Sequence, residues 1–133
     1  MDKLKIDILT PYGHYLRTEA DYLSVVSTQG MLGILPKHAP LITKIEVSEM
    51  SITNDGEMIK YAVSGGLLNI KGNNEVTILA NAIERSDEID IKRAEESKKR
   101  AEQRLEQDDV DIARARASLA RALNRIAVFS HKK

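Results

Sequence analysis

The sequence predicts an N-terminal domain of short β-strands, packed as a sandwich or a barrel, followed by a C-terminal hairpin of two antiparallel helices. All 7 Gly and all 3 Pro precede residue 73, and residues 73–133 contain neither. Gly and Pro interrupt helices and form turns, so the first part is expected to form strands and the last part helices. The apolar pattern changes in the same way, from a period of two to a helical period. We place the domains at residues 1–85 and 86–133.

Alternation of apolar and polar residues supports the strands of the first domain. It is clear at residues 4–8 and again at residues 76–78, and it is typical of strands that bury one face. Asn-Asp-Gly at residues 54–56 separates two such runs and predicts a hairpin. The pair Gly65-Gly66 after Ser64 predicts a tight turn or bulge, with a close approach to a partner backbone as the alternative.

Two helices are expected in the second domain. Ser86 or Asp87 is a candidate N-cap for a first helix over residues 90–105. The acidic pair at residues 108–109 suits the N-terminus of a second helix over about 110–129. The turn between them contains no Gly or Pro that would prevent the two helices from joining into one long helix. A fixed hairpin and a conformational switch therefore both remain open.

The two helices are expected to face each other through a seam of small residues. On the first helix the apolar line is thin and holds Ala94, Ala101 and Leu105, with Ser97 between them. Such a seam buries little apolar area, so the hairpin is expected to be only marginally stable. The expected seam of the second helix consists of Ile112, Ala115, Leu119, Ala122, Ile126 and Phe129.

Composition excludes several classes of function. The 20 Lys and Arg residues balance the 20 Asp and Glu residues, so there is no overall basic field for nucleic acid. The chain has no Cys, which excludes disulfides, thiol catalysis and Cys-based zinc sites. The first residues lack the apolar region of a signal peptide, and no apolar run approaches the length of a membrane span. We expect a soluble intracellular protein.

Catalytic motifs are missing from the sequence. There is no phosphate-binding loop, no dinucleotide fingerprint, no HExxH and no GxSxG. The three His residues are scattered and have no metal-ligand spacing. His38 is expected to be a turn residue or an interface residue. We expect no catalytic residue, no metal and no required cofactor.

Arginines are the most informative side chains of the second domain. Arg93 and Arg100 share one face of the first helix, because seven residues make about two turns. Residues 112–129 contain four Arg and no acid, so they cannot form ion pairs within their own helix. This is either a solvated basic face or a surface for a polyanion, such as nucleotide phosphates or an acidic patch on a protein. The four arginines are Arg114, Arg116, Arg121 and Arg125.

Four motifs in matching order resemble the epsilon-subunit family of bacterial F-type ATP synthases over essentially the whole chain. They are GMLGILPKHAPL at 30–41, SGG at 64–66, IDIKRA at 89–94 and RALNR at 121–125. The resemblance implies a sandwich of about ten short strands followed by the two-helix hairpin. It also implies a non-catalytic rotor subunit, peripheral at the cytoplasmic face of the bacterial cell membrane.

The resemblance further implies a set of partners. The sandwich domain would contact the gamma subunit and the c-ring of the membrane sector. The helices would extend toward the alpha and beta subunits and inhibit ATP hydrolysis there. The residues expected at partner surfaces are Met31, His38, Arg114 and Arg116.

ATP is implied as a regulatory ligand of the folded hairpin, without a required metal. The arginines of this set would bind phosphates, Glu84 the base or ribose, and Asp90 the adenine amino group unless it caps the helix. Two other functions remain open: a stand-alone ATP sensor that changes helix conformation, and a coiled-coil adaptor without a ligand. The implied nucleotide-binding residues are Glu84, Ile89, Asp90, Arg93, Ala94, Arg100, Arg121 and Arg125.

Overall fold

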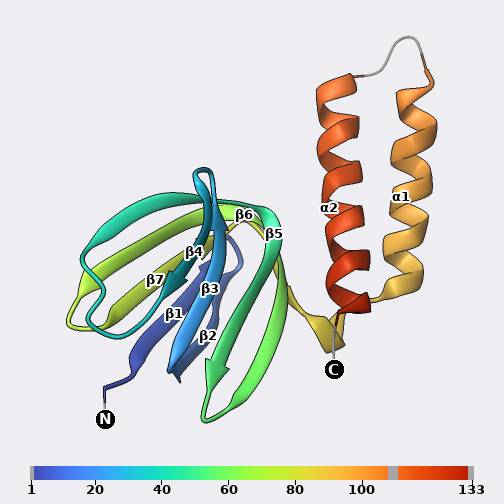
Figure 1. The fold of residues 1–133 in the computed structure, drawn as a ribbon. Helices are drawn as coiled ribbons and strands as arrows, with labels where there is room; N and C mark the ends of the chain where they lie inside the picture. The colour runs from blue at the N-terminus through green and yellow to red at the C-terminus, as the bar shows by residue number, and fades with distance from the viewer. Residues whose placement is uncertain (1, 108–110, 132–133) are drawn as a thin grey trace.

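The computed structural model describes residues 2–107 and 111–131, which form a β-sandwich followed by two helices (Figure 1). A single 3-10 turn, η1 (Ser86–Glu88), links the two parts. The helices are α1 (Ile91–Leu105) and α2 (Ile112–Ser130). The strands are β1 (Leu4–Thr10), β2 (Gly13–Ala20), β3 (Tyr22–Ser27), β4 (Gly30–Ile34), β5 (Leu41–Asn54), β6 (Glu57–Gly72), β7 (Glu75–Ala80) and β8 (Ile83–Arg85).

The sandwich fold is confirmed, with eight strands in the described residues where about ten were expected. The count is lower because β5 and β6 are long, with 14 and 16 residues, and both curve from one layer into the other (Figure 1). β6 pairs with β8 through residues 61–63 and with β7 through residues 66–72. The strand order is β2-β1-β7-β6-β5-β3-β4, and β1 runs parallel to β7.

The alternating runs of the sequence form the core. Leu4, Ile6 and Ile8 of β1 are at most 1% exposed, while their polar neighbours face outward. Facing strands contribute branched aliphatic side chains of similar size, which pack into one continuous cluster. The largest fully buried side chains are Leu4, Ile6, Ile8, Leu23, Ile34, Met50, Leu68, Ile70, Ile78, Val25, Val63 and Val76.

The two glycine-containing motifs behave as their chemistry requires. Asn54 pairs with Glu57 across a two-residue hairpin turn, in which Asp55 and Gly56 both have positive φ, 51° and 80°. Gly66 lies where β6 changes partner, and a Cβ there would be 2.1 Å from the Leu79 carbonyl oxygen. The expected tight turn or bulge is wrong, because residues 64–66 lie inside the continuous strand β6 and pair with β5 without a register shift. The alternative is confirmed: the backbone is approached closely, by β7 of the same chain.

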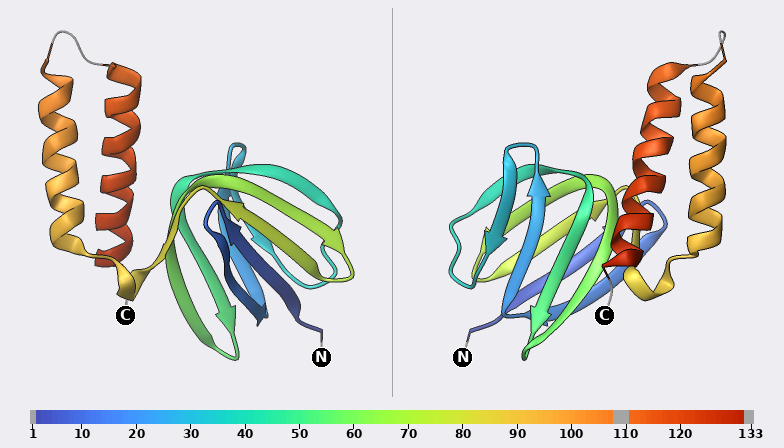
Figure 2. Two further views of the ribbon diagram at one scale, coloured as in Figure 1. Left: turned by 180° about the vertical axis from the view of Figure 1, so that it is seen from behind. Right: turned by 45° about the vertical axis from the view of Figure 1, so that its right-hand side comes forward.

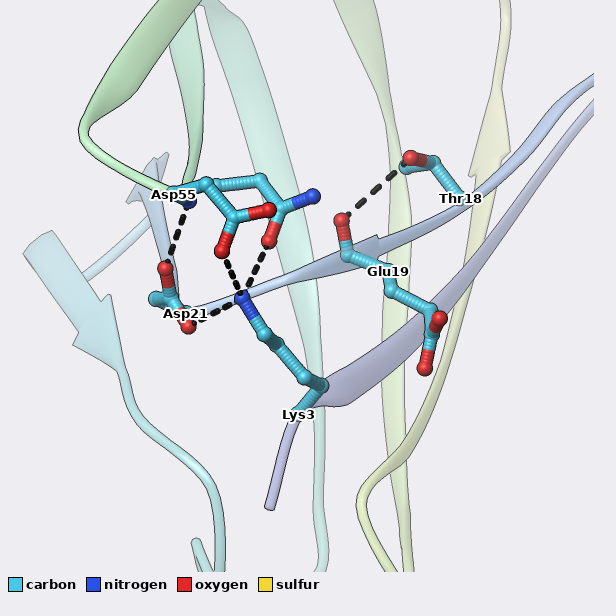
Figure 3. Close-up of polar contacts among 6 residues, drawn as sticks. Lys3, Thr18, Glu19, Asp21 and Asp55 are labelled. Atoms are coloured by element: carbon cyan, nitrogen blue, oxygen red, sulfur yellow. Dashed lines mark hydrogen bonds and ion pairs between the residues drawn. The ribbon is translucent and has the colours of Figure 1, made fainter. Parts of the chain in front are cut away.

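A polar cluster joins the N-terminal segment to two connections, β2–β3 and β5–β6, at one end of the sandwich (Figure 3). The Lys3 ammonium lies 2.7 Å from Asp21, 2.8 Å from Asp55 and 2.6 Å from the Asn54 side-chain oxygen. The Asp55 amide donates to the other Asp21 oxygen at 2.8 Å. Hydrogen bonding to Asp21 is the largest cause that raises the pKa of Lys3, and the same bond lowers the pKa of Asp21.

The helices form the expected antiparallel pair beside the sandwich (Figure 2), but their caps differ from the prediction. Ser86 and Asp87 lie in η1 and do not cap α1; Asp90 does, accepting from the Arg93 amide at 3.1 Å. Asp111 caps α2 in the same way through the Arg114 amide at 3.1 Å. The acidic pair at 108–109 lies outside the described residues. None of the described helices combines the length and apolarity needed to cross a membrane.

The seam between the helices is built from alanines. Ala94 and Ala101 of α1 and Ala115 and Ala122 of α2 are at most 3% exposed. The expectation for Ile112 is wrong, because its side chain is 50% exposed at the start of α2. Three other expected seam residues of α2, Leu119, Ile126 and Phe129, are only partly buried.

Candidate functional site

The C-terminal half of α2 is held against the sandwich by a small apolar contact. Val128 is fully buried against Ala62 of β6 and Ile89 of the linker, with Phe129 partly buried beside them. Sequence reasoning missed Val128, because it lies off the expected seam. Val128 faces the sandwich because α2 packs with one face on α1 and with a second face on β5 and β6.

Polar contacts from the same end of α2 complete this docking surface. The Asn124 side chain donates to the carbonyl oxygens of Ser48 at 2.9 Å and Val63 at 3.4 Å. The His131 ring lies 3.0 Å from Glu49, an ion pair only when the histidine is protonated. The Lys60 ammonium donates to the His131 carbonyl oxygen at 3.0 Å. Together with the ion pair between Arg125 of α2 and Glu84 of β8, one apolar contact and a few hydrogen bonds make up the docking surface.

A groove of about 350 Å³ runs between the two helices. Two of its arginines are oriented by serines of their own helix: Arg100 donates to Ser97 at 3.1 Å and Arg121 to Ser118 at 3.2 Å. The groove is lined by Ser97, Arg100, Ala101, Arg104, Ser118, Arg121 and Arg125.

The electrostatics of the groove favour an anion. Its lining contains four arginines and no acid. Glu84 of β8 contacts one of them from outside the lining, with 2.5 Å between its Oε1 and the Nε of Arg125. Like charges from α1 and α2 repel each other across the groove. An anion bound between them attracts both, so the net electrostatic interaction across the groove becomes favourable. Planar guanidinium groups that can donate in pairs suit phosphate or carboxylate oxygens.

The structure brings together four of the eight implied nucleotide-binding residues. Arg100 and Arg121 line the groove, and Arg125 lies there with Glu84 bound to it. The Arg93 side chain is exposed on the first turn of α1 and does not line the groove.

The remaining three residues of that set pack or cap the helices and do not line the groove. Ile89 is buried in the docking contact, at 5% exposed, and Ala94 is buried in the helix seam, at 3%. Asp90 caps α1, which was one of its two expected roles. The sequence missed Arg104, although its i+4 spacing from Arg100 places the two on one helix face.

The expected partner-binding residues lie on exposed or half-buried surfaces, and none of them lines the groove. Met31 of β4 is 79% exposed, and Arg114 and Arg116 are exposed on α2. His38 lies in the connection between β4 and β5, where its amide donates to the Leu35 carbonyl oxygen at 3.2 Å. His38 is thus a turn residue, which agrees with one of its two expected roles.

A larger hollow of about 620 Å³ lies at the junction of the sandwich and the helices. Its charges are mixed, since Lys60 and Arg85 face it together with Glu57 and Asp87, so it does not select an anion as the groove does. Beside it, burial raises the pKa of Tyr15, and the hydrogen bond that Tyr15 donates to Glu88 at 2.9 Å adds to this shift.

Over residues 2–107 and 111–131, no three His, Asp or Glu side chains gather as metal ligands.

Fold and groove together define a β-sandwich protein with an appended, arginine-lined pair of helices. Residues 3–86 match the beta-sandwich domain of the ATP synthase delta/epsilon chain, and residues 87–130 match the long alpha-helix domain of the same family. The chain belongs to the family of ATP synthase delta/epsilon chains.

Named relatives and solved structures agree with this assignment. An ATP synthase epsilon chain of Ruminococcus albus is 41% identical over 134 residues, covering 99% of this chain and all of the relative. Another, from Pelotomaculum thermopropionicum, is 43% identical over 101 residues, 76% of this chain and 75% of the relative. A chain of the Euglena gracilis mitochondrial ATP synthase has the same fold, with a TM-score of 0.78 at 14% identity over 98% of this chain and 82% of that chain.

Proposed function

We propose that this chain is the epsilon chain of a bacterial F-type ATP synthase, a non-catalytic subunit of its central stalk. Membership of the family and 41% identity to an epsilon chain over its whole length support this proposal. In this role the sandwich binds the gamma subunit and the c-ring at the cytoplasmic face of the membrane. Met31, whose side chain is 79% exposed, is available for such a contact.

The helix pair acts in this proposal as an inhibitor of ATP hydrolysis. Two features support it: the seam between α1 and α2 buries only small side chains, and α2 contacts the sandwich through a small docking surface. Both contacts cost little free energy to open. Once released, α2 presents an acid-free basic surface, including Arg114 and Arg116, to acidic segments of the alpha and beta subunits.

ATP is the proposed regulatory ligand, bound between the helices. The observation that carries this proposal is the meeting of Arg100, Arg121 and Arg125, from two different helices, in one groove without an acid in its lining. A triphosphate there joins α1 to α2 and stabilises the closed pair in proportion to ln(1 + [L]/Kd). ATP is a ligand in this role and is not hydrolysed by the chain.

Titration calorimetry on the intact chain tests the nucleotide site. Arg100→Ala and Arg121→Ala should each weaken ATP binding by about 1–3 kcal/mol, the range for a charge-assisted hydrogen bond. Arg116→Ala, exposed on α2 away from the groove, is the matched control and should bind as the wild type does. Arg93→Ala decides whether that arginine reaches the phosphates from the first turn of α1. Equal affinity in all four variants would show that the arginines form a solvated surface.

Inhibition is tested in the assembled enzyme. A chain that ends after Asp87 keeps every strand of the sandwich and should still assemble with gamma. ATP hydrolysis by membranes that carry it should rise above the wild-type rate, while ATP synthesis continues. Hydrolysis at the wild-type rate would remove the inhibitory role, and failure to assemble would show that the helices contribute to stalk binding.

A further inference from the structure

The Glu84–Arg125 ion pair links the nucleotide groove to the sandwich. Glu84 is held on β8, opposite Ala62 of β6, so its position is fixed by strand pairing. Arg125 belongs to α2 and lines the groove. Their side chains are 36% and 28% exposed, so the pair is partly shielded from water and is stronger than a fully exposed one.

Within the described parts of the chain, Glu84 is the one acid that pairs with a groove arginine. The side-chain bonds of Arg100 and Arg121 go to neutral serine hydroxyls, and the ion pairs of the described residues include neither of them nor Arg104. A carboxylate offers an arginine the same planar pair of acceptor oxygens as a phosphate does. Glu84 therefore satisfies Arg125 in the way that the ligand's phosphate would.

We propose that Glu84 is an internal competitor for the ligand's phosphates: its carboxylate holds Arg125 until an anion displaces it. This inference rests on the proposed function of the groove as a nucleotide site. It gives Glu84 a role opposite to a contact with the base or ribose, because a competitor lowers affinity whereas a contact raises it. Glu84 then sets how much phosphate ligand is needed to fill the groove.

The exchange has a consequence for the position of α2. Phosphate bound to Arg125 strengthens the contact between α1 and α2, but it removes the ion pair that joins α2 to β8. The remaining docking contacts, from Asn124, Val128 and His131, do not involve the groove. Ligand binding therefore closes the helix pair on itself and loosens its attachment to the sandwich.

Titration calorimetry of the full chain with tripolyphosphate and with ATP, at low salt, tests the proposal. Tripolyphosphate has no base or ribose, so it isolates the phosphate contacts. Glu84→Gln keeps the side chain's size and removes its charge, and it should bind both ligands about two- to fivefold more tightly, the fold-change that corresponds to a solvent-accessible ion pair. Glu49→Gln is the matched control, since Glu49 also contacts α2, through His131, but lies away from the groove arginines.

Each other outcome overturns the proposal in a recognisable way. Wild type and Glu84→Gln that bind tripolyphosphate equally would leave the groove as an anion site but remove the competitor. Weaker ATP binding by Glu84→Gln, with tripolyphosphate unchanged, would assign Glu84 to the base or ribose. Tighter binding by Glu49→Gln as well would trace the gain to a loosened docking surface. No binding by any of the three chains would overturn the nucleotide site itself.

A measurement on the wild-type chain guards against a variant that folds poorly. The carbon-13 signal of the Glu84 carboxyl should shift as tripolyphosphate is added, because the carboxylate loses its partner. The Glu49 signal should stay in place. A Glu84 signal that does not move at saturating tripolyphosphate would contradict displacement.

Discussion

The sandwich and the helix pair are built from side chains of different size. The sandwich buries Leu, Ile and Val from every layer in one cluster, whereas the helices bury four alanines between them. Each buried methylene contributes about 0.8 kcal/mol, so the two interiors differ greatly in stabilisation. A single chain therefore contains a permanent scaffold and an element whose contacts open at low cost.

The two parts also differ in how far their charges are compensated by neighbouring side chains. At one end of the sandwich, Lys3 is bound by Asp21 and Asp55, so its charge is compensated locally. Between the helices, Arg100, Arg104 and Arg121 face one groove whose lining has no acid. The sandwich compensates this charge within itself, whereas the lining of the groove offers its arginines no acid.

The largest difference is expected for truncation of a core leucine. Leu68→Ala on β6, where the side chain is fully buried, should lower the free energy of unfolding by about 2–5 kcal/mol, because it leaves a cavity that the sheet cannot close. Leu123→Ala on α2, where the side chain is 44% exposed, should change it by less than about 0.5 kcal/mol. Urea denaturation followed by circular dichroism measures both, and comparable losses would show that the helices share the stability of the sandwich.

A smaller loss is expected at the close approach between β6 and β7. Gly66→Ala places a Cβ 2.1 Å from the Leu79 carbonyl oxygen at a φ of +156°, so it should cost about 1–3 kcal/mol through overpacking. Gly13→Ala has a similar positive φ but no atom within 4 Å of the added Cβ. It measures backbone strain alone. If both variants lose the same stability in urea, the close approach has no cost of its own.

A still smaller loss of free energy is expected when the contact between α2 and the sandwich is weakened. Asn124→Ala removes the hydrogen bonds to the carbonyl oxygens of Ser48 and Val63 and should weaken docking by about 0.5–1.5 kcal/mol. Limited proteolysis should then cut α2 faster while the strands stay protected. Ser130→Ala, whose hydroxyl bonds only within α2 to the Ile126 carbonyl oxygen, is the control. Unchanged cleavage of the Asn124 variant would mean that the other docking contacts hold α2 without these hydrogen bonds.

The smallest effect is expected at the exposed Lys3 cluster. Lys3 lowers the pKa of Asp21 in the folded chain, so the pair stabilises the fold at neutral pH, and this contribution disappears as the pH falls through the folded pKa. In Lys3→Met the pKa of Asp21 should return toward its ordinary value, which an NMR titration of the carboxyl measures. Lys5→Met, two residues further along in β1, should leave the pKa of Asp21 in place. An unchanged Asp21 pKa in Lys3→Met would remove the ion pair as its cause.

Much of the sandwich could be predicted from local sequence. The alternation at residues 4–8 and the Asn-Asp-Gly turn depend on neighbouring residues only, and both are confirmed. The number of strands depends on how far β5 and β6 continue through their bends, which is decided by pairing with distant strands. The glycine pair indicated a close backbone approach as one alternative, but the sequence could not show that β7 is the neighbour.

The helix pair was predicted less completely, because its contacts are tertiary. Helical spacing gave the alanines of the seam but could not show that α2 turns Val128 toward the sandwich. It also favoured Ser86 or Asp87 as the cap of α1, because η1 adds a turn that the pattern does not reveal. The arginine stripes were visible in the sequence, whereas the contact between Arg125 and Glu84 required the fold.

Hydrogen exchange of the full chain with and without ATP tests most directly whether the helix pair is a separable, anion-stabilised element on a permanent scaffold. At an ATP concentration a hundred times Kd, exchange of amides beside the groove in α1 and α2 should slow about a hundredfold, which corresponds to about 2.7 kcal/mol. Amides of the β-strands should exchange at the same rate in both samples. Equal slowing throughout the chain, or no slowing in α1 and α2, would contradict the account.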